Sequence, residues 1–207
     1  MSRVFYLGLI ATLSAFHTPP ALADTAADEK AYLASPETRE AARVALKTAA
    51  EQVMPACATY SADDASTVVY KNLRLRNGRP EDGLFRESAT VHGCGTSRRI
   101  SVLGLVRPDG NVQRVALLPG TTLGDPIVQR DAIPYAISGA AKRIPAQCHD
   151  VRVKNTDFIG YDPATIENKK PWREIWTVSA CQATIAVDML FRPDSDGTTI
   201  IARPHKP

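Results

Sequence analysis

Two glutamates at similar positions in the two halves of the chain are the first candidates for chemistry. Glu87 follows Arg86, and Glu174 follows Arg173. A carboxylate pair can act as general acid and general base, as in glycoside hydrolysis, when an open groove holds the two groups about 5–9.5 Å apart. On strands, the same residues are typical of cross-strand ion pairs. Both a hydrolytic and a structural role therefore stay open.

Two tryptophans flank the second of these glutamates. Trp172 and Trp176 project to the same face of a strand, about 13 Å apart at the rise of a strand. In an exposed position they would form a stacking platform for a sugar or a peptide. Their counterparts, Phe85 and Ala89, equally fit a core in which large residues pack against small ones. The candidate ligand-binding residues are therefore Trp172, Trp176, Glu87 and Glu174.

Cysteine and histidine are the other residues that could supply a nucleophile or a metal site. His92 and His149 lie beside cysteines, but the chain contains no Cys-x-x-Cys pair. Zinc sites use closely spaced ligands, so we expect no metal. The sequence also lacks Gly-x-Ser-x-Gly, His-Glu-x-x-His, a phosphate-binding loop and a dinucleotide fingerprint. We expect no catalytic residue and no cofactor.

Composition and the N-terminal segment indicate an exported globular protein. The 207 residues are 44% hydrophobic, and Lys+Arg 25 against Asp+Glu 22 gives a net charge of +3, too small for nucleic acid or an anionic membrane. Segment 1–23 has Arg3, an apolar run and Ala21-Leu22-Ala23, which predicts a signal peptide cleaved before Asp24. No later run reaches the roughly 20 apolar residues of a membrane span. We expect a periplasmic or secreted location.

The rest of the chain contains an internal repeat. Small changes of offset, all in polar stretches with Pro or Gly, bring the two halves into alignment. The aligned residues include Cys57 with Cys148, Tyr70 with Tyr161, Phe85-Arg86-Glu87 with Trp172-Arg173-Glu174, Cys94 with Cys181, and Arg107-Pro108-Asp109 with Arg192-Pro193-Asp194. We predict one repeat unit over 24–119 and a second over 125–207, joined by a linker within 113–124.

Each unit is predicted to be a helix followed by an antiparallel β meander, so the fold class is α+β. The first helix begins after Ser35 and ends before Pro55, and the second begins at Asp125-Pro126, with Pro134 and Gly139 expected to interrupt it. Apolar alternation predicts the strands. They are expected near 66–76, 84–92, 99–107 and 111–118, and near 150–161, 172–181, 184–192 and 197–203.

Four cysteines in an exported chain predict two disulfides, and four cysteines allow three pairings. In each predicted unit the first cysteine follows the helix and the second ends the aromatic strand. This architecture favours one disulfide within each unit. The predicted pairs are Cys57 with Cys94 and Cys148 with Cys181.

The stretch from Trp172 to Cys181, Trp-Arg-Glu-Ile-Trp-Thr-Val-Ser-Ala-Cys, resembles the W-x-E-x-W-x-V-x-x-C motif of an uncharacterised exported proteobacterial protein family. The segments 118–132 and 191–199 are similar to further patterns of the same family. Gln182 stands where those proteins often have Gly. The resemblance implies an exported location and a shared fold, and it brings no catalytic residues.

These observations predict an exported module without catalytic activity, in a binding or a structural role. Duplication without repeated chemistry favours a cleft between the units, or an exposed sheet edge, as the place where a partner binds. The expected partner is an envelope protein, a peptide or a cell-wall fragment. The alternative is an envelope hydrolase that uses Glu87 and Glu174.

Overall fold

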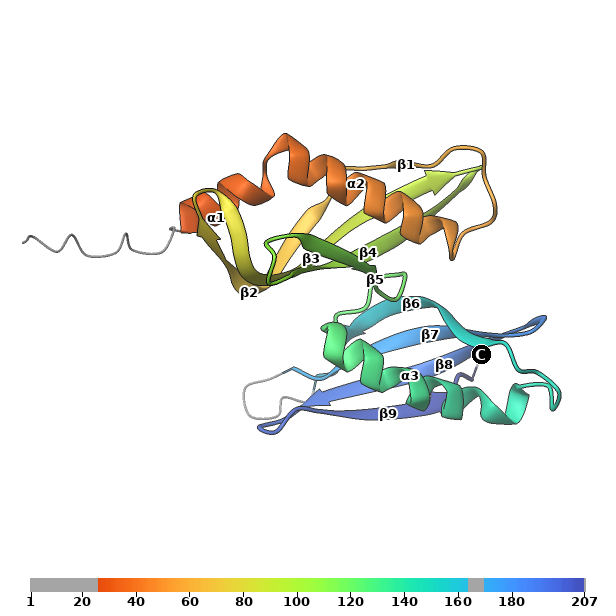
Figure 1. Cartoon of the computed structure of the whole chain (residues 1–207). Coiled ribbons are helices and arrows are strands. Elements are labelled where there is room, and N and C mark those ends of the chain that lie inside the picture. Colours follow the sequence, from red (N-terminus) through yellow and green to blue (C-terminus); the bar gives the residue numbers. More distant parts are fainter. Residues whose placement is uncertain (1–25, 164–169, 207) are drawn as a thin grey trace, which may run out of the picture.

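The computed structural model describes residues 26–163 and 170–206, which form three α-helices and two antiparallel sheets (Figure 1). The predicted α+β class is confirmed. The predicted signal peptide over 1–23 and the cleavage site before Asp24 lie outside the described residues. No helix within those described ranges is long and apolar enough to cross a membrane.

The first half of the chain forms sheet A with two helices, and the second half forms sheet B with one helix. The first half contains α1 (Ala26–Leu33), α2 (Pro36–Glu51), β1 (Ser61–Ala62), β2 (Ser66–Arg76), β3 (Arg79–Gly93), β4 (Thr96–Val106) and β5 (Val112–Ala116). The second half contains α3 (Pro126–Ala140), the 3-10 turn η1 (Ala141–Arg143), β6 (Val151–Tyr161), β7 (Trp172–Ala180), β8 (Ala183–Pro193) and β9 (Thr198–Pro204). The segment after β5 joins the two halves (Figure 1).

Helix α2 is stabilised by an N-terminal cap and by the burial of one apolar face. The Ser35 hydroxyl accepts a hydrogen bond from the Thr38 amide at 3.2 Å, and Pro36 occupies the first turn, where its missing N–H breaks no helical bond. One face of α2 packs against β3 and β4. The buried residues of this face are Ala42, Leu46, Ala49 and Ala50. The first predicted helix is confirmed.

Sheet A has the strand order β1-β3-β4-β5, and β2 pairs with β3 beside β1. Alternate residues of the central strands point toward α2, as the period of two predicts. The core beneath α2 contains Ala89, Val91, Ile100 and Val102. Strand β5 pairs with β4 on one side and forms an edge of the sheet.

Sheet B is a meander in the order β6-β7-β8-β9, and α3 covers one of its faces. Helix α3 runs unbroken from Pro126 to Ala140, so the prediction that Pro134 and Gly139 interrupt it is wrong. Proline removes one hydrogen bond, which the burial of small residues on the sheet side of α3 outweighs. A Cβ at Gly139 would lie 2.6 Å from Val187 Cγ1, so glycine permits the close approach of helix and sheet.

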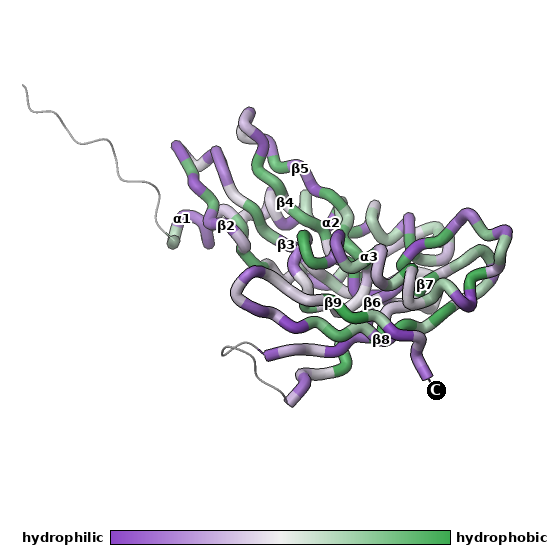
Figure 2. Tube along the Cα trace, turned by 90° about the horizontal axis from the view of Figure 1, so that it is seen from below, coloured by the Kyte–Doolittle hydropathy of each residue, from purple (hydrophilic) through white to green (hydrophobic). Residues whose placement is uncertain are grey.

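The eight predicted strands correspond to β2 through β9, and the two Arg-Pro-Asp segments lead into the hairpin turns after β4 and β8. Figure 2 shows hydrophobic stretches within the strands and hydrophilic residues at hairpin turns. Helix α1 and strand β1 were not predicted. Helix α1 has no buried residue, and therefore no apolar stripe that a sequence could reveal, and β1 is only two residues long.

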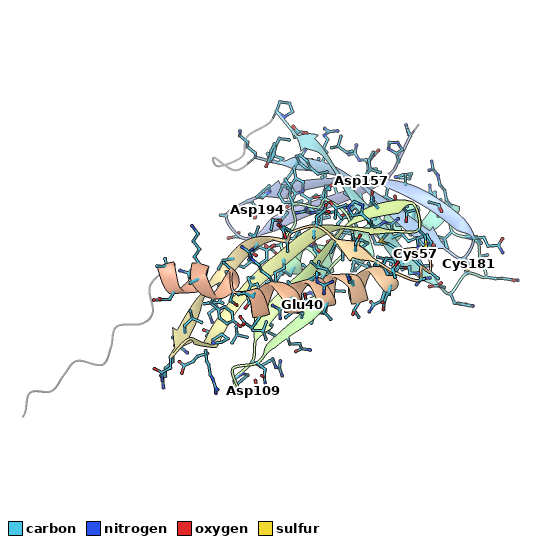
Figure 3. The ribbon with its side chains drawn as sticks, turned by 90° about the horizontal axis from the view of Figure 1, so that it is seen from above. Glu40, Cys57, Asp109, Asp157, Cys181 and Asp194 are labelled. Atoms are coloured by element: carbon cyan, nitrogen blue, oxygen red, sulfur yellow. A yellow bond between two sulfur atoms is a disulfide. The ribbon has the colours of Figure 1, made fainter. Side chains whose placement is uncertain are left out.

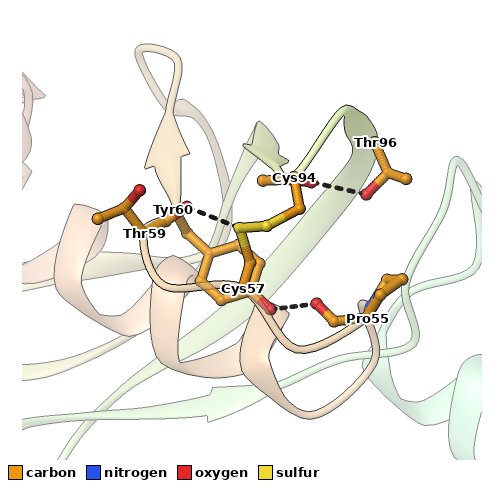
Figure 4. The surroundings of a disulfide bond; sticks show 7 residues. Pro55, Cys57, Thr59, Tyr60, Cys94 and Thr96 are labelled. Carbon is orange, nitrogen blue, oxygen red and sulfur yellow. Dashed lines mark hydrogen bonds between the residues drawn. A yellow bond between two sulfur atoms is a disulfide. The ribbon is translucent and has the colours of Figure 1, made fainter.

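Both predicted disulfides are present: Cys57 with Cys94 and Cys148 with Cys181, with Cα separations of 5.7 and 5.8 Å. In each unit the second cysteine starts a tight hairpin turn with a positive φ, of 47° and 55°. Figure 4 shows the first disulfide, where the Tyr60 hydroxyl donates to Pro55 O at 2.6 Å. Figures 1 and 3 place the disulfide-bearing ends of the two sheets on the same side of the molecule.

The two halves therefore share a long helix, a meander of four strands and a disulfide in the same place. The origin of this likeness in an internal duplication stays a prediction, as do the unit boundaries 24–119 and 125–207.

Candidate functional site

Glu174 lies at the centre of a buried hydrogen-bond cluster in sheet B. It is 1% exposed and points from β7 to the face that α3 covers. Its oxygens accept hydrogen bonds from Trp172 Nε1 (2.7 Å), Trp176 Nε1 (2.7 Å), Thr122 Oγ1 (3.0 Å) and the Leu123 amide (2.9 Å). We call these five residues the Glu174 cluster. Four donors satisfy a carboxylate that has no proton of its own to donate.

The two tryptophans belong to the core of sheet B. Trp176 is fully buried and Trp172 is 9% exposed. Trp172 stacks on Phe191 with ring centroids 4.9 Å apart, and Trp176 contacts the same ring at 6.0 Å. Of the two roles that the sequence leaves open, burial favours packing in the core over a ligand platform, because the face that the two side chains share is the one that α3 covers. The Trp-x-Glu-x-Trp spacing places both indole N–H groups beside Glu174, since residues two apart share a strand face.

The segment between the two units, residues 117–124, is hydrogen-bonded to both sheets, and we call it the linker. Toward sheet A, the Gly120 amide donates to a carbonyl of β4 at 2.8 Å. Toward sheet B, the Thr156 amide of β6 donates to Pro119 O at 2.9 Å, and the Thr121 amide donates back to Thr156 O at 2.6 Å. The linker is therefore an ordered element that connects the units.

A buried glutamine and a glycine hold the linker in this path. Gln129 of α3, 3% exposed, accepts from the Leu118 amide at 3.1 Å and donates to Gly124 O at 2.8 Å. Gly120 has a φ of +113°, and a Cβ there would lie 2.0 Å from Thr156 O. Glycine is required because no side chain fits between the linker and β6.

Glu87 is buried in sheet A, where it forms an ion pair. It is 2% exposed, and Arg114 of β5 donates to its two oxygens at 2.7 and 3.3 Å. The side chain of Arg114 is 11% exposed and also reaches Thr38 O at 3.5 Å. Because the pair is bidentate, the guanidinium satisfies both carboxylate oxygens.

The two glutamates are not brought together. Glu87 and Glu174 lie in different sheets, and among the described residues no hydrogen bond or ion pair connects them. Each carboxylate is buried and occupied by its own donors. An acid/base pair needs a shared open groove, so the prediction that they form a catalytic or ligand-binding pair loses its geometric basis.

Metal and thiol chemistry find no support in the described ranges 26–163 and 170–206. No group of three or more His, Cys, Asp or Glu side chains there is arranged to hold a metal ion. All four cysteines are in disulfides. His92 pairs with Asp63 at 3.1 Å, and His205 pairs with Asp188 at 2.7 Å.

A side chain of the first unit reaches the main chain of the second unit beside the linker. Arg98 donates from β4 to Lys154 O of β6 at 3.2 Å. Arg86 lies over the ring of Tyr70, 5.8 Å from its centroid. Burial raises the pKa of the Tyr70 phenol, Arg86 opposes this rise, and Asp125 at the start of α3 adds to it.

A cavity of about 640 Å³ opens in the first unit. Helices α1 and α2 form one wall, and the β2–β3 hairpin, the β4–β5 turn and β5 form the other. Its lining residues are Asp28, Ala31, Tyr32, Ser35, Glu37, Thr38, Ala41, Leu75, Gly78, Gly110, Asn111, Val112 and Arg114. We call this cavity, together with the adjoining free edge of β5, the β5 groove. Apolar and hydrogen-bonding groups converge in it, as they do in ligand sites.

Sequence reasoning missed the β5 groove and the residues that bind the two glutamates. Arg114 and Thr122 are remote in the chain from Glu87 and Glu174, and nothing in their local patterns identifies these partners. The one available signal was Arg114, a basic residue inside a short apolar strand.

Comparison with known proteins finds no match for this chain among protein-family models, curated proteins or solved structures.

Proposed function

We propose that this protein is an exported, non-catalytic module that binds a peptide or an extended segment of a partner protein in the β5 groove. One observation carries the proposal: a cavity of about 640 Å³ adjoins a free sheet edge. Exposed sheet edges with neighbouring side-chain pockets are a recurring mode of peptide recognition.

The chemistry of the rest of the molecule supports a binding role. The candidate acid/base residues, Glu87 and Glu174, are buried among their own donors. Trp172 and Trp176 lie in the core, so they offer no exposed surface on which a cell-wall sugar could stack. Two disulfides are typical of an oxidising compartment outside the cytoplasm, which supports export.

The experiment places a large side chain in the cavity from helix α2 and measures the effect on peptide binding. Linear peptides are selected on the disulfide-bonded protein from a phage-displayed random library, and the best peptide is titrated by fluorescence anisotropy. Ala41 is an exposed residue of α2 that lines the cavity, so Ala41→Arg is expected to weaken peptide binding at least tenfold. Val44, 52% exposed on the same helix and outside the cavity lining, provides the matched control Val44→Arg.

Equal binding to the wild type and to both variants would show that the peptide binds elsewhere. Failure to select any peptide would contradict the proposed function itself.

A further inference from the structure

We infer that the ligand binds by adding a strand to β5, so that its main chain pairs with the edge of sheet A. This inference rests on the proposed function and specifies how the β5 groove recognises its ligand. Three observations support it: the outward-pointing main-chain groups of β5, the contacts made at the other edge strands, and the position of the cavity.

The hydrogen-bond pattern shows which groups of β5 are free. The Arg107 amide donates to Asn111 O, and the Leu117 amide donates to Ser101 O, which marks the hydrogen-bonded positions of the β4–β5 pair. In an antiparallel pair these positions alternate with positions whose main-chain groups point outward. The outward-pointing residues of β5 are Val112, Arg114 and Ala116. Within the part of the chain that the structure describes, no hydrogen bond reaches their main-chain N–H groups.

Two of the other three long edge strands, β6 and β2, are hydrogen-bonded by neighbouring segments. At β6, the linker pairs with Thr156, and the Thr121 hydroxyl accepts from the Phe158 amide at 2.9 Å. At β9, helix α3 packs against the strand, but no hydrogen bond among the described residues reaches the outward amides of Ile200 and Ala202. At β2, Glu29 of α1 accepts from the Leu73 amide at 2.6 Å, and the strand is irregular in register. Proteins normally block such edges, and β5 is the strand that combines an open edge with the adjoining cavity of about 640 Å³, which favours it as the place for strand addition.

The cavity lies where side chains of an added strand would point. The side chains of Val112 and Arg114 face α2, and both line the cavity. Alternate residues of an added strand point to this same side of the sheet. Tyr32, Leu75 and Val112 give the cavity apolar surface, and Glu87 neutralises the Arg114 guanidinium. Because Asp28 and Glu37 also line the cavity, the matching ligand side chain has an apolar body and no negative charge. The partner is therefore an extended peptide segment that pairs with β5 and points one such side chain into the cavity.

The test removes, one at a time, the outward N–H groups of Val112 and Ala116, which take no part in the pairing of β5 with β4. Proline is tolerated on an edge strand where the N–H faces outward, so Val112→Pro and Ala116→Pro are expected to keep the fold. The probe is the peptide selected from the phage-displayed library on the wild-type protein. Each proline variant is expected to bind it at least tenfold more weakly. Gln113, whose main chain faces β4, provides the control Gln113→Ala, which is expected to bind like the wild type.

A second measurement does not depend on the variants. Amide hydrogen exchange, followed by NMR on the wild-type protein, is expected to slow at least tenfold at Val112, Arg114 and Ala116 when the peptide binds. The amides of Gln113 and Val115 already pair with β4 and are expected to change little.

The outcomes distinguish peptide binding in the β5 groove, which is the proposed function, from strand addition to β5. If Ala41→Arg weakens binding while the proline variants bind like the wild type and the three amides show no added protection, strand addition is wrong and the proposed function stands. If no peptide is selected, or Ala41→Arg has no effect, both are overturned. If β5 instead pairs with β5 of a second copy, seen as a dimer that Val112→Pro dissociates, a peptide partner is excluded.

Discussion

At the scale of single residues, two buried glutamates at similar positions are stabilised in different ways. Glu87 is paired with one cation, Arg114, whereas Glu174 is surrounded by four uncharged donors. A buried carboxylate is costly unless its charge is compensated or its lone pairs accept hydrogen bonds. The charge of Glu87 is compensated by a cation, and the lone pairs of Glu174 accept hydrogen bonds. In both sites the carboxylate connects elements that are distant in sequence.

The Glu174 cluster predicts a large effect from a nearly isosteric change. In Glu174→Gln an amide NH2 group replaces one carboxylate oxygen. This NH2 is a donor and faces groups that are themselves donors, so at least one hydrogen bond of the cluster is lost. The expected loss is about 2–3 kcal/mol of unfolding free energy, measured by urea denaturation followed by tryptophan fluorescence. The exposed Glu51→Gln is the control and is expected to change stability by less than about 0.5 kcal/mol. Equal stability of the two variants would contradict the role assigned to the cluster.

The ion pair of sheet A is best tested with a double variant. Arg114→Met leaves Glu87 buried without its cation and is expected to lower the unfolding free energy by about 3–5 kcal/mol. Glu87→Leu combined with Arg114→Met removes both charges and is expected to recover most of that loss. The measurement is urea denaturation of the single and double variants. A double variant as unstable as Arg114→Met alone would show that packing, and not an unpaired charge, dominates the effect.

At the scale of elements, the linker organises the contact between the two units. Residues 117–124 pair with β4 on one side and with β6 on the other, and Gln129 and Glu174 bind its main chain. Main-chain groups in a buried loop need hydrogen-bond partners, which explains why polar residues of the second unit are buried around it. The linker thereby restrains how the two sheets lie relative to each other.

Gly120 is the position at which the linker is expected to be most sensitive. Gly120→Ala puts a Cβ against Thr156 O and strains a φ of +113°, so we expect a loss of about 2–4 kcal/mol as the bridge to β6 breaks. Gly78→Ala is the control, because Gly78 has a φ of +74° but no atom within 4 Å of the added Cβ. It is expected to cost about 1–2 kcal/mol. Urea denaturation of both variants checks the difference, and equal losses would contradict it.

At the scale of the whole molecule, each unit has its own core and its own disulfide. The core of the first unit lies between α2 and sheet A, and the core of the second lies between α3 and sheet B. Each disulfide closes a loop within one unit, with sequence separations of 37 and 33 residues. The disulfides therefore restrain the units separately, while the linker connects them.

Removal of either disulfide is expected to destabilise the protein to a similar extent. Replacing Cys57 and Cys94 by Ser, or Cys148 and Cys181 by Ser, should lower the unfolding free energy by about 3–4 kcal/mol, because similar loops lose similar restraint on the unfolded chain. Urea denaturation measures the loss, and hydrogen exchange locates it. Increased exchange is expected first in the unit that has lost its disulfide, and equal increases in both units would contradict their separate stabilisation.

The long strands, helix α2 and both disulfides could be predicted from local patterns in the sequence, whereas α1 and β1 could not. Alternating apolar residues indicated the strands from β2 to β9, the Ser35-Pro36 cap marked α2, and the order of elements predicted both disulfides. These features depend on local spacing, which reports the period of an element and the face that it buries.

What covers each face of a strand or helix depends on how the elements pack together. Trp172 and Trp176 share a strand face, as their spacing requires, but the packing of α3 makes that face a core and not a binding surface. Likewise, Pro134 stays inside α3 because its neighbours are buried on sheet B. The partners of Glu87 and Glu174, and the open edge of β5, depend on contacts between residues far apart in the chain. Local spacing carries no information about such contacts, because they arise only when the elements pack.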